Sequence, residues 1–216
     1  ASETPLSALA LAALAEEAGI PAGVINVVTG SASVIGPTLT RSPIIRKISF
    51  TGSTDVGRRL MAESAATLKK MSLELGGNAP FIVFEDADLD AAVQGLMASK
   101  FRNSGQTCVC TNRVLVQASV HDAFVEKLRN AVAKLQVGNG LQEGTTQGPL
   151  INNAALVRIE GLLANLQNSG ARVVCGGNRH ALGGTFFEPT VITGVKNSSS
   201  LAQEELFAPI APVIAF

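Results

Sequence analysis

Helix-type and strand-type patterns alternate along this chain, and the alternation constrains its fold more than any other feature. Apolar residues at helical spacing predict helices over 5–18, 33–40, 53–66, 88–101, 119–135 and 153–168. Short apolar runs predict strands over 24–28, 46–50, 80–84 and 113–116. This order is typical of an α/β fold with a largely parallel sheet. The hydrophobic content of 46% is consistent with strands that are covered on both faces.

The charge balance and the cysteines narrow the class of protein. Because 17 basic residues offset 17 acidic ones, no electrostatic argument favours nucleic acid or an anionic membrane as a partner. The apolar stretch 6–15 is too short to span a bilayer. Three cysteines favour a reducing compartment, either the cytoplasm or, since the true N-terminus is not visible, the mitochondrial matrix. Two of these cysteines with the distant His121 and His180 do not make a metal-ligand set, so we expect no metal site.

Two glycine-marked turns carry a pair of reactive side chains. Glu74 lies in the segment 73–78, LELGGN, and Cys108 ends the segment 105–108, GQTC. Glycines allow the backbone of such turns to approach a bound substrate. A thiol that attacks a carbon forms a covalent intermediate, and a carboxylate can activate the water that later releases it. Glu74 and Cys108 could therefore supply both halves of one catalytic cycle.

At these motifs the sequence resembles the NAD(P)-dependent aldehyde dehydrogenase superfamily, whose corresponding motifs read LELGG and GQxC. The wider segment 100–110, KFRNSGQTCVC, resembles the succinate-semialdehyde dehydrogenase branch in particular. The resemblance covers essentially all 216 residues. It implies the end of a Rossmann-type cofactor domain at 1–73 and a catalytic domain at 74–216 that is incomplete at its C-terminal end. Family members are more than twice as long, so the chain resembles an internal portion of the whole enzyme.

The resemblance gives Cys108 and Glu74 their expected roles. Cys108 would attack the aldehyde carbon, and its own backbone N–H could stabilise the oxyanion that forms. Glu74 would activate the water that hydrolyses the thioester, and its apolar neighbours are expected to raise its pKa by desolvation. The alternatives from the residues alone are a cysteine packed as a small hydrophobe and a carboxylate that faces solvent at a strand end.

The segment 50–57, FTGSTDVG, is the expected cofactor turn. It follows a predicted strand, opens a predicted helix and keeps two of the three glycines of GxGxxG. By itself the pattern is also that of a capped strand-helix junction. The resemblance assigns Thr51, Gly52 and Ser53 to cofactor binding, with Ser53 bonding phosphate, and the carbonyl of Leu75 to the nicotinamide amide.

Two further segments bear on the cofactor. The segment 204–209, EELFAP, resembles the family motif EExFGP, which implies that Glu205 accepts from the nicotinamide ribose and that Phe207 packs on that sugar. Ala208 stands where the family usually has glycine, and its Cβ could shift this contact. Ser2 falls where NAD-preferring members often have glutamate. Because serine can donate to a 2′-phosphate, this position favours NADP over NAD.

Arg102 and Cys110 flank the candidate nucleophile. Arg102 follows a predicted helix and could hold the far carboxylate of a short aldehyde through a bidentate pair, as the resemblance implies. Its alternative role is to neutralise the helix C-terminus. Cys110 is a possible redox partner of Cys108, although cysteines two residues apart bridge only in a mobile loop. Passive packing of Cys110 is the alternative.

The leading interpretation is an enzyme that oxidises succinate semialdehyde to succinate with NADP or NAD. One alternative is a dehydrogenase for another ω-carboxy aldehyde, such as glutarate semialdehyde. A second alternative is a non-catalytic nucleotide-binding fragment. The expected partner is a small aldehyde substrate, and the resemblance implies a homodimer or homotetramer in the full-length form.

Overall fold

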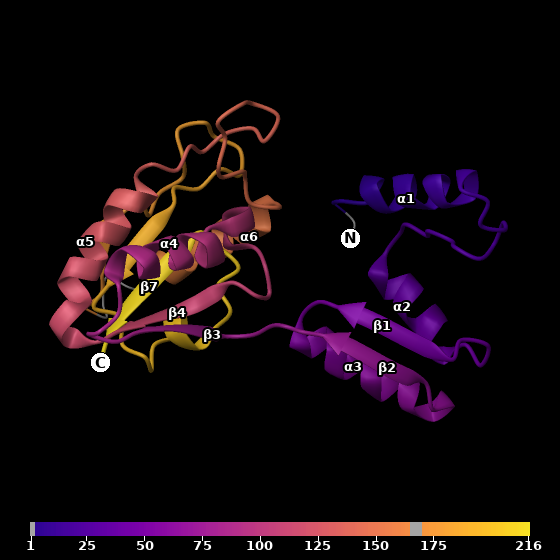
Figure 1. The fold of residues 1–216 in the computed structure, drawn as a ribbon. Helices are drawn as coiled ribbons and strands as arrows, with labels where there is room; N and C mark the ends of the chain where they lie inside the picture. The colour runs from indigo at the N-terminus through magenta and orange to yellow at the C-terminus, as the bar shows by residue number, and fades with distance from the viewer. Residues whose placement is uncertain (1–2, 165–169) are drawn as a thin grey trace. The chain divides into compact units, whose positions relative to one another are not determined.

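The computed structural model describes residues 3–164 and 170–216 and is shown in Figure 1. The chain divides into two compact units, Ala1–Gly76 and Gly77–Phe216. Both units combine helices with parallel strands, so the predicted α/β class is confirmed. In the described part of the chain, no helix has the length and apolar character that a bilayer crossing requires.

The first unit is built around a parallel pair of strands joined by a helix. Strand β1 (Lys47–Thr51) pairs with β2 (Lys70–Glu74) in a register that aligns Thr51 with Glu74. Between them, α3 (Thr54–Ser64) begins at the N-cap Ser53, whose hydroxyl accepts from the backbone N–H of Val56 at 3.4 Å. The other elements of this unit are α1 (Leu6–Glu17), α2 (Ala32–Arg41) and the short η1 (Ala65–Thr67).

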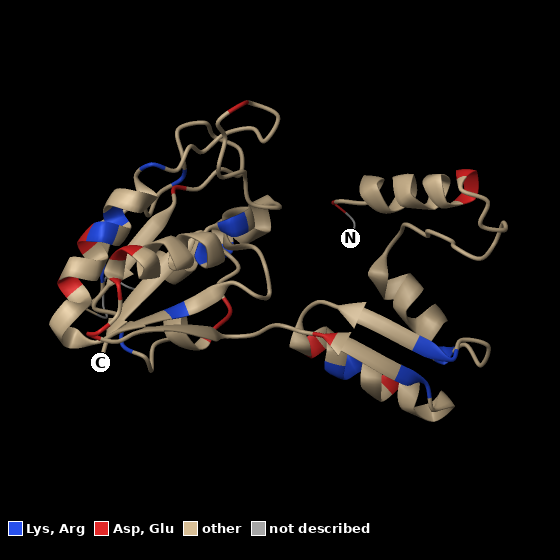
Figure 2. Cartoon of the chain, in the orientation of Figure 1, with Lys and Arg blue, Asp and Glu red and all other residues tan. Residues whose placement is uncertain are grey.

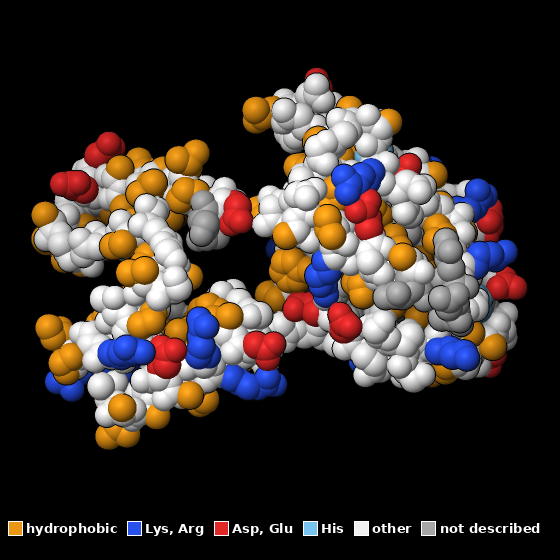
Figure 3. All heavy atoms as spheres, turned by 180° about the vertical axis from the view of Figure 1, so that it is seen from behind, with side chains coloured by type: hydrophobic (Ala, Val, Ile, Leu, Met, Phe, Trp, Pro, Cys, Tyr) orange, Lys and Arg blue, Asp and Glu red, His pale blue; other side chains and the backbone are white. Residues whose placement is uncertain are grey.

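The prediction of a buried strand at 24–28 is wrong. The segment is irregular, and Val24 and Val28 are 65% and 74% exposed. An apolar run forms a strand only where another strand satisfies its backbone groups, and β1 and β2 pair with each other instead. The apolar side chains of α1 are likewise exposed, with Leu6 at 77%. Figure 3 shows hydrophobic side chains on the surface of this unit.

The second unit is a mostly parallel sheet covered on both faces. Its strand order among the described residues is β3-β4-β7-β6-β5, and every pairing is parallel except β5 with β6. The strands are β3 (Ala79–Val83), β4 (Thr111–Val116), β5 (Arg172–Cys175), β6 (Thr190–Thr193) and β7 (Ile210–Ala215). The helices are α4 (Leu89–Lys100), α5 (His121–Val132), α6 (Asn153–Ala164) and α7 (Ser200–Gln203), with the short η2 (Arg102–Gly105) and η3 (Ala118–Val120).

Alternate residues of the central strands enter two different cores. On β4, Val114 and Val116 pack with α4 and α5, whereas Leu115 packs with the cluster that contains residues of α6. Side chains of a strand alternate between faces, so one strand contributes to both cores. A fully buried residue such as Phe124 or Leu156 stabilises the fold by about 1.5–3 kcal/mol relative to an exposed one. In Figure 2 most charged residues of this unit lie on its helices and loops.

Two predicted helix boundaries differ from the structure. The helix expected to start at Ser119 with a capping box begins at His121, after η3. The hydroxyl of Ser119 instead donates to Glu85 at 2.9 Å, so it does not cap α5. The helix predicted over 153–168 is described as Asn153–Ala164, and its remaining residues lie outside the described residues.

Candidate active site

The candidate nucleophile Cys108 lies in a strained turn between α4 and β4. In η2 the consecutive residues Asn103, Ser104 and Gly105 have φ values of 49°, 57° and 71°. Non-glycine residues adopt positive φ uncommonly, and such strain concentrates at functional sites. Cys108 follows this turn and is an exposed free thiol.

The turn is tied to the segment 148–151 by side-chain hydrogen bonds. The amide of Gln106 donates to the carbonyl of Pro149 at 3.2 Å and accepts from the backbone N–H of Ile151 at 2.8 Å. The buried hydroxyl of Ser104 donates to the carbonyl of Gly148 at 2.9 Å. These bonds hold the exposed thiol on a fixed backbone, as a catalytic nucleophile requires.

Two glycines bring other segments against this turn. A Cβ added at Gly105 would lie 2.0 Å from the carbonyl oxygen of Ala208 and 3.0 Å from the nitrogen of Pro209. Only glycine therefore fits where the turn meets the segment 204–209. A Cβ added at Gly77 would lie 3.7 Å from the carbonyl oxygen of Cys108, which is ordinary contact.

Cys110 is a buried free thiol with polar neighbours. Its Sγ lies 2.7 Å from the hydroxyl of Thr107 and 3.9 Å from the carbonyl of Lys100. The redox partnership with Cys108 stays a prediction. Among the described residues, no group of three His, Cys, Asp or Glu side chains could hold a metal ion.

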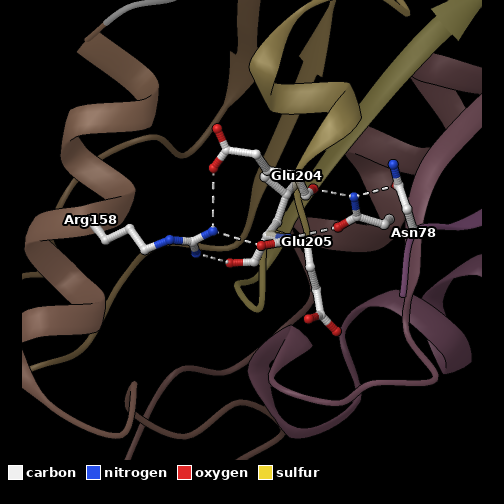
Figure 4. A network of polar contacts seen from close by, with 6 residues as sticks. Asn78, Arg158, Glu204 and Glu205 are labelled. Atoms are coloured by element: carbon white, nitrogen blue, oxygen red, sulfur yellow. Dashed lines mark hydrogen bonds and ion pairs between the residues drawn. The ribbon is translucent and has the colours of Figure 1, made fainter. Parts of the chain in front are cut away.

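The segment that carries Glu205 is fixed by the buried Asn112, and Figure 4 shows Asn78, Arg158, Glu204 and Glu205 of this network. The amide of Asn112 donates to the carbonyl of Glu204 at 2.6 Å and to the side chain of Asn78 at 2.7 Å. Its oxygen accepts from the backbone N–H of Leu206 at 2.9 Å. Asn112 is only 3% exposed, so these bonds form away from competing water.

Arg158 of α6 holds the same segment from the other side. Its guanidinium donates to the carbonyls of Glu205 at 2.7 Å and Leu206 at 2.8 Å, and lies 3.7 Å from the carboxylate of Glu204. The carboxylate of Glu205 points away from Arg158 (Figure 4), and its Oε1 is buried without a hydrogen-bond partner in the described part of the chain. A buried carboxylate oxygen with no protein donor can accept from a ligand hydroxyl.

Phe207 and Ala208 bear on the expected contact with the nicotinamide ribose. Phe207 is 41% exposed and has a φ of 50°, so the turn places an apolar ring at the surface beside Glu205. Ala208 is fully buried and does not have a positive φ. The strain therefore falls on Phe207, and the backbone at position 208 does not require glycine.

In the first unit, the predicted cofactor turn and Glu74 lie at the same edge of the sheet. Thr51 and Glu74 end the two parallel strands, and the N–H of Gly52 donates to the carbonyl of Glu74 at 3.0 Å. Ligands of open α/β sheets bind beyond the carboxyl ends of strands. Glu74 is exposed, so the enclosure expected from its apolar neighbours is not found.

Leu75 lies against the helix that follows the cofactor turn. A Cβ added at Gly57 of α3 would lie 2.7 Å from Cδ2 of Leu75, so glycine lets this helix approach the residue. The same unit contains a cavity of about 670 Å³, which the sequence did not predict. Residues of α2, β1 and α3 line it, among them Ile35, Phe50 and Leu60.

The remaining predicted site residues have different outcomes. Arg102 is exposed, and its guanidinium makes no hydrogen bond or ion pair within the described ranges. Ser2, the basis of the expectation for NADP, lies outside the described residues.

Asn112 and Arg158 were not predicted as site residues, because a polar residue that binds backbone carbonyls carries no sequence motif. Lys100 was also missed, although its spacing from Val93 and Leu96 places it on the buried face of α4.

Comparison with known proteins relates the whole chain to one family. The model of the aldehyde dehydrogenase family matches residues 1–216. A glutarate-semialdehyde dehydrogenase of Pseudomonas aeruginosa is 61% identical over 216 residues, which are 100% of this chain and 45% of that protein. The NADP(+)-type succinate-semialdehyde dehydrogenase of Escherichia coli is 58% identical with the same coverage. A solved succinate-semialdehyde dehydrogenase from Burkholderia pseudomallei matches with a TM-score of 0.98 and 60% identity, again over 100% of this chain and 45% of that one. The chain thus spans about 45% of the length of these relatives.

Proposed function

The chain belongs to the aldehyde dehydrogenase family, and on this premise we propose that the full protein oxidises a short ω-carboxy aldehyde to the acid with NADP or NAD. The observation that carries the proposal is Cys108, an exposed thiol on a turn that side-chain hydrogen bonds hold in place. The relatives named for glutarate and succinate semialdehyde support this substrate class.

The first chemical step belongs to Cys108. Its thiolate attacks the aldehyde carbon, a C–S bond forms, and the carbonyl oxygen becomes an oxyanion. The backbone N–H of Cys108 donates to that oxyanion and stabilises it. Loss of hydride from the same carbon then leaves a thioester on Cys108.

The residues present fit a dinucleotide. The buried Oε1 of Glu205 has no partner among the described side chains and suits a ribose hydroxyl. In the first unit Thr51, Gly52 and Ser53 precede α3, whose N-terminal N–H groups suit phosphate. When bound, the nicotinamide supplies the acceptor for the hydride. Leu75 would hold the nicotinamide amide through its carbonyl, and Phe207 would pack on the ribose.

Glu74 completes the cycle in this proposal. Its carboxylate takes a proton from water, the resulting hydroxide attacks the thioester carbon, and the C–S bond breaks. The products are the carboxylic acid and the free thiolate of Cys108. General-base catalysis of this kind typically accelerates a step by about 10²–10⁴-fold.

Arg102 is the proposed substrate clamp. Its exposed guanidinium has no partner within the described ranges and remains available to a ligand carboxylate. Its carbonyl lies 3.9 Å from Sγ of Cys110, which ties it to the turn of the candidate nucleophile. A bidentate arginine-carboxylate pair would orient the aldehyde as well as bind it.

The identity of the substrate, the choice of cofactor and the oligomeric state are also proposals. Succinate semialdehyde is the proposed substrate, with glutarate semialdehyde as the alternative that the P. aeruginosa relative supports. NADP is the proposed cofactor, and the NADP(+)-type E. coli relative supports it. We further propose a homodimer or homotetramer in the cytoplasm, or in the mitochondrial matrix, and that Cys110 can act as a redox partner of Cys108. The domain roles, cofactor for 1–73 and catalysis for 74–216, stay a prediction.

The test is formation of reduced cofactor by the full-length protein. Succinate and glutarate semialdehyde are each supplied with NAD and with NADP, and Cys108→Ala is the control. Turnover that requires Cys108 supports the proposal, and the better aldehyde and cofactor decide the finer assignments. A folded full-length protein that oxidises neither aldehyde would instead favour the non-catalytic nucleotide-binding alternative.

A further inference from the structure

Lys100, the last residue of α4, is fully buried. It is the largest of the completely buried side chains among the described residues, and its Nζ has no hydrogen-bond partner there. Burial lowers the pKa of Lys100 from 10.5 to about 8, against the attraction of Cys110 and then of Glu205, which raise it. These two are the titratable groups that act on Lys100 within the described part of the chain.

This environment is unusual for a lysine. A lysine at a helix C-terminus normally buries its apolar stem and keeps its ammonium in water. The other buried lysine, Lys69, donates to the carbonyls of Ser42 and Ile45. Among the described residues, the ammonium of Lys100 has no hydrogen-bond partner, although burial of an unpaired ammonium is costly. A structural role at the helix end therefore does not explain its burial.

Glu205 also has a buried polar atom without a hydrogen-bond partner among the described residues. Its Oε1 is buried without a donor, and it attracts Lys100 without a direct ion pair between them. The backbone on both sides of Glu205 is fixed by Asn112 and Arg158, so the position from which this side chain extends is held in place. An unpaired ammonium and an unpaired carboxylate oxygen thus lie in one region, each with hydrogen-bonding capacity left for a ligand or water.

We propose that Lys100 is a positioning residue for the cofactor, because its ammonium attracts the Glu205 carboxylate and holds it directed at the ribose hydroxyls. The inference rests on the proposed function. Hydrogen bonds to a charged acceptor are about twice as strong as neutral ones, so the direction of this carboxylate matters for the binding of a hydroxyl.

The test measures cofactor binding rather than turnover. The full-length protein carrying Cys108→Ala, which removes the titration of the nucleophile, is titrated with NADPH and with NADH, and binding is followed by their fluorescence. The dissociation constant is expected to rise about tenfold as the pH passes through about 8 and Lys100 loses its proton. Lys100→Met is expected to bind about tenfold more weakly at neutral pH and to lose this pH dependence.

Four further variants test whether Lys100 acts through Glu205. Glu205→Gln should also bind without the pH dependence, and adding Lys100→Met to it should weaken binding little further, since the two effects share one interaction. Lys69→Met is the matched control, because it removes a buried lysine outside this region and should keep the pH dependence. Cys110→Ser should keep it as well.

Several outcomes would overturn the inference. Binding by Lys100→Met that matches the parent at every pH would show that Lys100 acts only in folding. Loss of the pH dependence in Cys110→Ser, with its retention in Glu205→Gln, would make Cys110 the partner of Lys100. A folded parent that binds neither NADPH nor NADH would refute the proposed cofactor use itself. If Lys100→Met fails to fold, a pH dependence retained by Glu205→Gln still refutes the pairing.

Discussion

Replacement of Gly105 by alanine tests the contact between the nucleophile turn and the segment 204–209. An alanine Cβ would lie 2.0 Å from the carbonyl oxygen of Ala208 and 2.4 Å from its carbonyl carbon. Both atoms belong to the backbone, and hydrogen bonds of Asn112 and Arg158 hold the neighbouring residues in place. The overlap therefore cannot be relieved by rotation of a side chain.

The expected magnitude has two parts. At a φ of 71°, a non-glycine residue is strained by about 1–2 kcal/mol. The overlap adds about 1–3 kcal/mol, as overpacking does in a well-packed interior. Gly105→Ala should thus lower the free energy of unfolding by about 2–5 kcal/mol. A displacement of about 1 Å in the turn could also reduce kcat by about 100-fold.

Gly183 provides a matched control, because its φ is 73° and nothing lies within 4 Å of an added Cβ. Urea unfolding of the full-length protein should show a loss of about 1–2 kcal/mol for Gly183→Ala, from backbone strain alone. Adding Ala208→Gly to Gly105→Ala should restore nothing, since the clash is with the backbone. Equal losses for Gly105→Ala and Gly183→Ala would refute the close approach of the two segments.

Three further predictions address other parts of the structure. Asn112→Ala should destabilise the full-length protein to urea by about 2–4 kcal/mol, because three hydrogen bonds of a buried side chain are lost; a loss below about 1 kcal/mol would contradict that role. Arg102→Ala should raise KM for succinate semialdehyde at least about tenfold and leave that of butanal unchanged, and an equal effect on both aldehydes would refute the clamp. Below pH 8 Lys100 is charged in both the folded and the unfolded protein, and above pH 10.5 it is neutral in both. The free-energy cost of burying its ammonium in the folded protein therefore disappears between these pH values. Relative to Lys100→Met, the stability of the parent should accordingly rise by about 3 kcal/mol from pH 8 to 10.5 in urea titrations, and a constant difference would show that the ammonium is not buried.

Local patterns predicted the fold class and most helices because amphipathic spacing reports directly on packing. The helix α4 follows its predicted range closely, and Asp88 caps it through bonds to the N–H groups of Asp90 and Ala91. The segment 24–28 has the same apolar character as a buried strand, yet strand formation depends on a partner that no local pattern specifies. The strands β2, β5, β6 and β7 were not predicted; β6, for example, is short, is buried throughout and lacks alternation.

The candidate site, too, could be predicted only in part from the sequence. Cys108 and Glu205 lie in motifs, and their segments could be recognised from the sequence. The residues that hold the segment of Glu205, Asn112 and Arg158, lie far from it in sequence and bind its backbone atoms, so only the fold brings them together. Lys100 could be placed on a buried face from its spacing, but the missing partner of its ammonium is visible only in three dimensions.

In the proposed mechanism, Cys108 forms the covalent intermediate and Glu74 is needed to release it. The most direct measurement is mass spectrometry of the full-length Glu74→Gln variant after incubation with succinate semialdehyde and oxidised cofactor. We expect one added acyl group on the peptide that contains Cys108, and no added group when cofactor is omitted or Cys108 is also replaced by alanine. Acylation of a different residue, or undiminished turnover by Glu74→Gln with no acylated peptide, would contradict this mechanism.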